Sequence, residues 1–273
     1  MVETSITTHI PPDASPDRLF MLISHMHEQG ITFESASSLM DFANELGFGR
    51  RSELHLFAVM CGLLKRDANE EIKLTEAGHT LATIRPEIRA DLAHFCIYTA
   101  YDPSEARSRT ESWAYQQVVN SLWSHSPIEV LSTVNIVSEE VNNSAKELFG
   151  DNISFGSKSI RGVRKWLEAL SPPVIEADIF TRRSFCLPEL ALLATAHIAQ
   201  QTDASLGIDL LLTPARREAI SRLCLLEPAA LDRTFDWMLP LYPQIVTPGT
   251  TAGAYGRFIR FLRWPTMSDL LRR

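Results

Sequence analysis

The chain has 273 residues, of which 45% are hydrophobic and 22% charged, and this fits a soluble protein with one large domain or two to three small ones. No apolar run approaches the roughly 20 residues that a membrane helix needs, and the first residues lack the basic start and apolar stretch of a signal peptide. We therefore expect a cytoplasmic protein that does not enter a membrane.

The net charge of -7 is unevenly distributed, because residues 1–150 carry -10 and residues 151–273 carry +3. An acidic surface repels the phosphates of nucleic acids, so any contact with DNA is expected in the second half. The four cysteines lie far apart and none forms a CxxC pair: Cys61, Cys96, Cys186 and Cys224. They are typical of reduced, buried thiols in a cytosolic protein.

The segment from residue 17 to residue 85 predicts a first small module, after a flexible N-terminal lead over residues 1–16 that contains three prolines. Apolar residues at helical spacing predict helices, and two β-prone runs after them predict a ribbon. The helices are predicted over residues 18–28, 38–46 and 51–64, and the strands at Leu63–Leu64 and Ile72–Leu74. Thr75 is expected to cap a further short helix. Three helices and a two-stranded ribbon are the plan of a winged-helix module.

A helical connector is predicted over residues 86–125, with a break near Asp102–Pro103. It is rich in aromatic residues: Phe95, Tyr98, Tyr101, Trp113, Tyr115 and Trp123. Aromatic rings at helical spacing usually pack, so we expect these rings to form a core between modules. A ligand cage among Phe95, Tyr98, Trp113 and Tyr115 is the alternative.

A second module with the same layout is predicted over residues 126–188. Its helices are predicted over residues 127–131, 137–149 and 157–170, with Ser157 as an N-cap, and its strands at Val174–Ile175 and Phe185–Leu187 around a tip at residues 178–183. The apolar positions of its third helix match those of the first module: Ile160, Val163, Leu167 and Leu170 fall on Leu54, Phe57, Cys61 and Leu64. The sequence thus predicts one module used twice.

Residues 189–273 are a candidate third module with a basic C-terminal end. Helices are predicted over residues 189–201, from Pro214 and from Pro228, since proline suits the first turn of a helix. Residues 244–261 then predict a strand, a glycine-rich loop and a strand, and the loop resembles a wing tip more than a phosphate loop, because no helix with Lys-Ser/Thr follows it. The predicted fold class is mainly α with small β-ribbons, α+β, built from tandem winged-helix modules joined by a helical connector.

The outward face of the third helix decides which module suits DNA, because this helix enters the major groove in helix-turn-helix proteins. At about 100° per residue the second module presents a row of cations there, and the expected wing tips supply more. The predicted DNA-binding residues are Lys158, Arg161, Arg164 and Lys165 on the helix, Arg182 and Arg183 at the tip, and Arg257 and Arg260 in the third module's ribbon. The corresponding faces of the other modules hold Ser52, His55, Val59 and Gly62 in the first, and Asp232, Arg233 and Asp236 in the third. Neither suits phosphates.

No motif for catalysis is present: the sequence has no GxxxxGKS/T, no HExxH and no GxSxG. His25 and His27 are two residues apart, so on a helix they point in different directions and do not form a metal site. We therefore expect no enzymatic activity and no cofactor or metal.

Two stretches carry a resemblance to known families. Gly47 to Ala82, GFGRRSELHLFAVMCGLLKRDANEEIKLTEAGHTLA, resembles winged-helix domains of bacterial transcription regulators, above all in the LTEAG run after the wing. Gly156 and the WLEAL run of residues 166–170 are similar to winged-helix accessory proteins of prokaryotic DNA-modification and phage-defence clusters. The resemblance implies association with DNA or assembly into a larger machine, and it carries over no catalytic residue.

Three functions stay open from the sequence. The first is a non-enzymatic subunit that binds or positions double-stranded DNA in a multiprotein prokaryotic system of defence, modification or regulation. The second is an acidic protein–protein adaptor, which would hold a partner or a second copy of the chain through residues 1–125. The third is a transcriptional regulator that senses a ligand among the aromatic residues of the connector.

Overall fold

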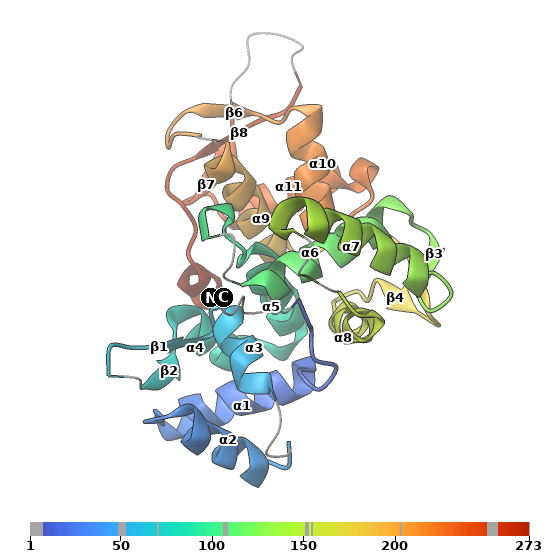
Figure 1. Cartoon of the computed structure of the whole chain (residues 1–273). Coiled ribbons are helices and arrows are strands. Elements are labelled where there is room, and N and C mark those ends of the chain that lie inside the picture. Colours follow the sequence, from blue (N-terminus) through green and yellow to red (C-terminus); the bar gives the residue numbers. More distant parts are fainter. Residues whose placement is uncertain are drawn as a thin grey trace. The chain divides into compact units, whose positions relative to one another are not determined.

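The computed structural model describes residues 8–48, 53–69, 71–105, 109–150, 153, 155–202, 204–249 and 256–272. The chain is mainly helical with short antiparallel strands, so the predicted α+β class is confirmed (Figure 1). It divides into two compact units, Met1–Thr181 and Arg182–Arg273, and each is described by itself. None of the described helices is long and apolar enough to cross a membrane.

The first unit contains one order of elements twice. In the first copy α1 (Pro16–Gln29) is followed by the extended residue Phe33, α2 (Ala36–Glu45), α3 (Leu54–Met60), β1 (Leu64–Arg66) and β2 (Ile72–Leu74). In the second copy α6 (Thr110–Ser124) is followed by β3 (Ile128–Glu129), α7 (Val134–Phe149), α8 (Ser157–Glu168), β4 (Ile175–Glu176) and β5 (Ile179–Phe180). Between the copies lie α4 (Glu76–Thr83), α5 (Pro86–Thr99) and a 3-10 turn at Pro103–Glu105. The helix α6, which the sequence assigned to the connector, is therefore the first helix of the second copy.

The second unit contains the same order once more. The helix α9 (Pro188–Gln201) is followed by β6 (Asp209–Leu211), α10 (Pro214–Leu223), a 3-10 turn at Pro228–Ala230, α11 (Leu231–Leu241), β7 (Val246–Pro248), β8 (Phe258–Phe261) and a last 3-10 turn at Met267–Arg272. The three predicted helices and the two ribbon strands of this region are confirmed, whereas β6 was not predicted. The glycine-rich loop lies mostly outside the described residues.

The strand order is also the same in all three copies, with the last strand in the middle. In the second copy β5 pairs with both β3 and β4, and in the third copy β8 pairs with both β6 and β7, all antiparallel. In the first copy β2 pairs with β1, and a bridge between Phe33 and Ile72 takes the place of the first strand. Three stretches of different sequence thus share one element order and one sheet topology.

Local sequence signals explain where several helices start and stop. Pro16 opens α1, where its fixed φ suits the first turn, and Gly30 closes it at a φ of 62° that favours glycine. The predicted cap at Thr75 is confirmed, because its hydroxyl accepts from the Gly78 amide at 3.1 Å. The Thr213 hydroxyl caps α10 in the same way and accepts from the Arg216 amide at 3.3 Å.

Two predicted elements of the second copy are wrong. Residues 127–131 form no helix, because Ile128–Glu129 pairs with β5 as a strand. The return strand of the ribbon is β5 and not Phe185–Leu187, because Ala177 and Asp178 adopt φ values of 47° and 68° and turn the chain within two residues. The predicted tip at residues 178–183 therefore does not exist.

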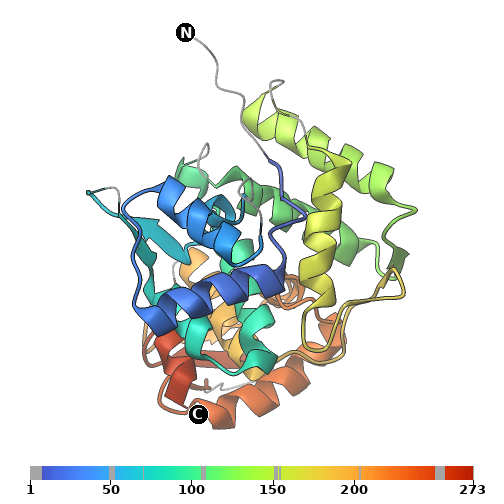
Figure 2. The same cartoon turned by 90° about the horizontal axis from the view of Figure 1, so that it is seen from below.

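Residues 8–14 form an irregular segment that runs along α8 and ends in a turn, where the Ala14 amide donates to the Pro11 carbonyl oxygen at 3.0 Å. We call it the N-terminal strap (Figure 2). We expected residues 1–16 to be a flexible lead. For the described residues from 8 onward this prediction is wrong, because Ile10 is fully buried and Ala14 is nearly so. The strap lies between the two copies of the first unit, since its backbone bonds to α8 of the second copy and its Pro11 lines a pocket together with Phe57 of α3 in the first.

Trp166 of α8 joins the parts of the first unit. Its ring stacks on Phe57 of α3 with 5.7 Å between centroids and meets Phe20 of α1 edge-on at 6.1 Å. Its indole N–H donates to the carbonyl oxygen of Ala14 in the strap at 2.9 Å. One fully buried side chain thus contacts both copies and the strap.

Four of the six aromatic residues expected in a core are buried, and the other two, Phe95 and Tyr101, are half-buried. Tyr98, Trp113, Tyr115 and Trp123 are buried. The hydroxyl of Tyr115 hydrogen-bonds to Nδ1 of His94 at 2.8 Å, and that of Tyr98 donates to Oδ1 of Asn120 at 2.6 Å. These bonds satisfy the polar ends of the buried rings.

Replacing Trp166 with alanine should destabilise the first unit strongly. The change deletes a fully buried indole and leaves a cavity, which typically costs about 3–5 kcal/mol in the free energy of unfolding. Urea denaturation followed by far-UV circular dichroism measures this cost. Trp237→Ala is the matched control, because that ring is 54% exposed and its loss should cost about 0.5 kcal/mol or less. A Trp166→Ala protein as stable as the control would contradict the assigned role.

Candidate nucleic-acid interface

Two rows of α8 are buried, and they face different neighbours. Ile160, Val163 and Leu167 form the predicted inward row of the second copy's core. Ser159, Gly162 and Trp166 form a second buried row under the strap and the first copy. The helix starts one residue earlier than a Ser157 cap implies, because Gly156 is the N-cap and Ser157 the first helical residue.

The third row of α8 is exposed and basic. Lys158, Arg161 and Lys165 are exposed, in agreement with the predicted outward face. Lys158 and Arg161 form no ion pair with any described residue, and the Lys165 ammonium donates to the Pro12 carbonyl oxygen at 2.8 Å. Seven residues at 1.5 Å each place the first and last cation about 10.5 Å apart along the helix axis.

Arg164 was predicted as a DNA contact, but its guanidinium already has two carboxylate partners. Its Nε donates to Oε1 of Glu168 at 2.6 Å, and its Nη1 lies 2.9 Å from Oδ1 of Asp178. Asp178 belongs to the turn between β4 and β5, and it also accepts from the Leu131 amide at 3.1 Å. Arg164 therefore fixes the ribbon to α8 and is not available to a phosphate.

Arg182 and Arg183 do not lie at a wing tip, because the ribbon turns earlier than predicted. Both belong to the second unit. Arg183 is only 4% exposed, and its Nε donates to the carbonyl oxygen of Cys224 at 2.9 Å. Nη1 of Arg182 lies 3.6 Å from Oε2 of Glu227. The predicted phosphate contact of Arg183 is thus excluded by its burial, and that of Arg182 is opposed by its carboxylate neighbour.

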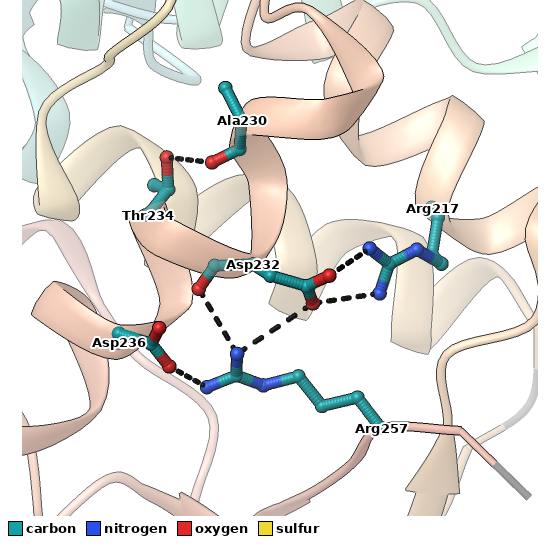
Figure 3. Close-up of polar contacts among 6 residues, drawn as sticks. All are labelled: Arg217, Ala230, Asp232, Thr234, Asp236 and Arg257. Carbon is teal, nitrogen blue, oxygen red and sulfur yellow. Dashed lines mark hydrogen bonds and ion pairs between the residues drawn. The ribbon is translucent and has the colours of Figure 1, made fainter.

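Arg257 was predicted to contact phosphate but is held by α11 (Figure 3). Its Nη2 donates to Oδ1 of Asp236 at 2.9 Å, and its Nη1 donates to the carbonyl oxygen of Asp232 at 3.0 Å. The guanidinium also lies over the Phe235 ring, 5.3 Å from its centroid. Arg217 donates to both carboxylate oxygens of Asp232, at 3.0 and 2.6 Å. The exposed carboxylates of α11, expected on its outer face, are therefore neutralised by arginines of the same unit.

Arg260, the other predicted cation of the C-terminal ribbon, is also paired, and so is Arg263 just after it. Arg260 donates to Oδ1 of Asp209 at 2.8 Å. Arg263 makes two bonds of 2.7 Å to Asp269, which hold the pKa of that carboxyl well below its usual range. Of the basic C-terminal patch predicted for the third module, Arg257, Arg260 and Arg263 are thus neutralised within the second unit, whereas the side chains of Arg272 and Arg273 lie outside the described part of the chain.

Sequence reasoning missed the second buried row of α8. Its signal was present in the chain, because Ser159, Gly162 and Trp166 are spaced at i, i+3 and i+7. Small residues and a large ring at this spacing are typical of a helix face packed against another segment. The single inward row that we assigned left this face unexplained.

The described residues contain no group of three or more His, Cys, Asp or Glu side chains that could hold a metal ion. All four cysteines lie within the described ranges, are buried and form no disulfide. Burial raises the pKa of Cys96 to about 12 and raises that of Cys61 as well. Thiols with raised pKa values stay protonated at neutral pH and are poor nucleophiles.

Asp232→Asn should lower the stability of the second unit in a pH-dependent way. Hydrogen bonds from Arg217 lower the pKa of Asp232 from its ordinary 3.8, so the carboxylate stabilises the fold above about pH 4, and this contribution is lost as the pH falls through the lowered pKa. Exposed ion pairs contribute little, so we expect a loss of about 0.5–1 kcal/mol near pH 7. Thermal unfolding between about pH 3 and pH 7 checks this, with the exposed Glu139→Gln as control. A difference that stays constant over this range would contradict the ion-pair explanation.

Comparison with known proteins finds no relative of this chain. No protein-family model matches the chain. No curated protein and no solved structure matches it either.

Proposed function

We propose that this chain is a non-enzymatic tandem winged-helix protein that binds double-stranded DNA through the exposed row of α8. The observation that carries the proposal is the pair Lys158 and Arg161, exposed on the third helix of the second copy without a carboxylate partner among the described residues. Exposed cations without a carboxylate partner gain the most binding free energy from phosphates, because they break no existing ion pair when they bind.

The repeated topology supports the winged-helix part of the proposal. The second and third copies have the order helix, strand, helix, helix, strand, strand, with the last strand between the other two, and in the first copy the Phe33 bridge stands in for the first strand. In helix-turn-helix proteins the recognition helix is the last one of the module. In the second copy this position belongs to α8, which precedes the ribbon of β4 and β5.

The corresponding helices of the other copies are less suited to DNA. The first copy's α3 has only seven residues and exposes Leu56 at 56%. The helix α11 carries Asp232 and Asp236 on its exposed face. An apolar face and a face of carboxylates offer phosphates no counter-charge. We therefore assign DNA binding to the second copy alone.

On this proposal the chain positions DNA within a multiprotein prokaryotic system of defence, modification or regulation. The support is the resemblance of the WLEAL run, Trp166 to Leu170, to accessory proteins of such clusters. Both the DNA-positioning hypothesis and the adaptor hypothesis include a protein partner. Only one of the three copies carries the cationic row, so the other two copies are left to contact that partner.

A protein–protein adaptor is the second candidate function, and one observation favours it. Trp237 of α11 is 54% exposed and lies 5.2 Å from the Phe185 ring, beside Asp236. Exposed tryptophan is a frequent anchor of protein interfaces. A stable complex with a partner that forms without nucleic acid, by a protein with no affinity for duplex DNA, would favour this function over the first.

The double variant Lys158→Glu with Arg161→Glu should weaken DNA binding at every base sequence. It replaces two counter-charges of phosphate with like charges, so we expect at least a tenfold loss of affinity at low salt, with a salt slope shallower by about 2. Fluorescence anisotropy of a labelled duplex, titrated with protein at several salt concentrations, measures both quantities.

The matched control is Lys65→Glu with Lys146→Glu, on β1 and α7. Both lysines are exposed, and the change in net charge is the same. An equal loss of affinity in the control would show that only the net charge matters. Unchanged affinity in the α8 variant would reject the assignment of the interface.

A further inference from the structure

The strap is bound to α8 along four of its residues. The Ile10 amide donates to Oγ of Ser159 at 3.1 Å, and Nδ1 of His9 lies 3.2 Å from the same oxygen. Two carbonyl oxygens of the strap accept from the helix: that of Pro12 from the Lys165 ammonium at 2.8 Å, and that of Ala14 from the Trp166 indole at 2.9 Å. Figure 2 shows the strap passing alongside the helix.

Gly162 lets the strap approach the helix backbone. A Cβ atom at this position would lie 2.6 Å from the carbonyl oxygen of Ile10, a separation that side-chain carbons do not tolerate. The strap therefore lies directly against the helix, in a space that any other residue would occupy.

The strap borders the cationic row of α8. At about 100° per residue, Gly162 is only about 40° from Lys158 and about 60° from Lys165 around the helix. The two buried rows together leave an exposed arc of about 120°, from Arg164 to Lys158. A recognition helix that enters a groove needs both of its flanks clear, and here one flank is occupied.

The width of the major groove decides whether α8 can enter it with the strap on one flank. An α-helix with its side chains is about 10–12 Å across, and the major groove of B-DNA is about 12 Å wide. The strap lies against α8 at Gly162 and Ser159 and adds its own width on that side of the helix, so α8 and the strap together are wider than the groove. The cations at the exposed arc reach the phosphates at the rim, while the base edges on the floor stay out of reach.

The ribbon of the second copy adds no compensating contact to bases. Its turn consists of Ala177 and Asp178 alone, and Asp178 is paired with Arg164. A two-residue turn with a carboxylate does not extend along a minor groove. Neither the helix nor the ribbon of this copy therefore places a donor where sequence is read.

We propose that the strap restricts α8 to the sugar–phosphate backbone, so that the interface binds duplex DNA without reading its base sequence. This inference rests on the proposed function, because it concerns the same row of cations. The strap residues 8–14 and Gly162 are the elements that set the specificity.

Selection from a randomised duplex pool by the wild-type protein tests the proposal, together with anisotropy titrations of duplexes of equal length and different sequence. We expect no enriched motif, dissociation constants within about threefold of one another, and a salt slope of about -2 to -3, as two to three phosphate contacts give. One sequence bound about 100-fold more tightly than the rest would overturn the inference and leave the proposed function intact. No binding to any duplex at about 50 mM salt would instead reject the proposed function.

A variant that displaces the strap tests its role directly. Gly162→Ala pushes the Ile10 carbonyl away and releases Lys165 from Pro12, so the salt slope should steepen by about 0.9, the value of one added phosphate contact. Hydrogen exchange at the Ile10 amide reports the displacement. Gly156→Ala is the matched control, because a Cβ there meets nothing within 4 Å and should change neither quantity.

Ser159→Ala provides a second way to loosen the strap without adding an atom, since it removes the acceptor of the Ile10 amide. It keeps the test valid if Gly162→Ala does not fold. Faster exchange at Ile10 in either variant with an unchanged salt slope would overturn the role of the strap.

Discussion

The burial of the Trp166 indole is the constraint on which the first unit depends. A buried indole N–H needs an acceptor, and the Ala14 carbonyl supplies it. This bond sets the register of the strap, since Pro12 and Ile10 then fall opposite Lys165 and Ser159. The same ring stacks on the first copy. The helix that carries the exposed cations is thus held from two sides, and its orientation in the unit follows from one side chain.

One topology presents three different outer faces along this chain. The third helix of the second copy is basic, that of the third copy holds carboxylates clamped by Arg217 and Arg257, and that of the first copy exposes Leu56. The sheet and the buried rows fix the topology, whereas the exposed positions carry few packing constraints. The number of arginines in a sequence therefore says little about DNA binding. In the second unit their carboxylate partners lie within the fold.

Local signals allowed the prediction of most helices and of two ribbons, whereas contacts distant in sequence decided the rest. Apolar spacing and helix caps act within one turn, and the predicted cap at Thr75 is confirmed. The strand β3 has two residues and exists through its pairing with β5, about fifty residues later, so no local pattern marks it. The candidate site shows the same division. The exposure of Lys158 and Arg161 followed from helical periodicity, but the burial of Arg183 depends on a two-residue turn that moved it out of the ribbon.

The two candidate functions are compatible in physical terms. Non-specific binding of proteins to DNA typically has dissociation constants of about 10⁻⁴–10⁻⁶ M at physiological salt. Two or three phosphate contacts, opposed by a net charge of -7, would place the proposed interface at the weak end of that range or below it. A contact of this strength holds a protein on DNA only when a second binding event raises its effective concentration. The exposed Trp237 on α11 offers a surface for such an event. If the proposed function holds, weak binding of α8 to the DNA backbone and a separate protein contact are parts of one mechanism, in which the partner would set the location on DNA and α8 would contact the duplex.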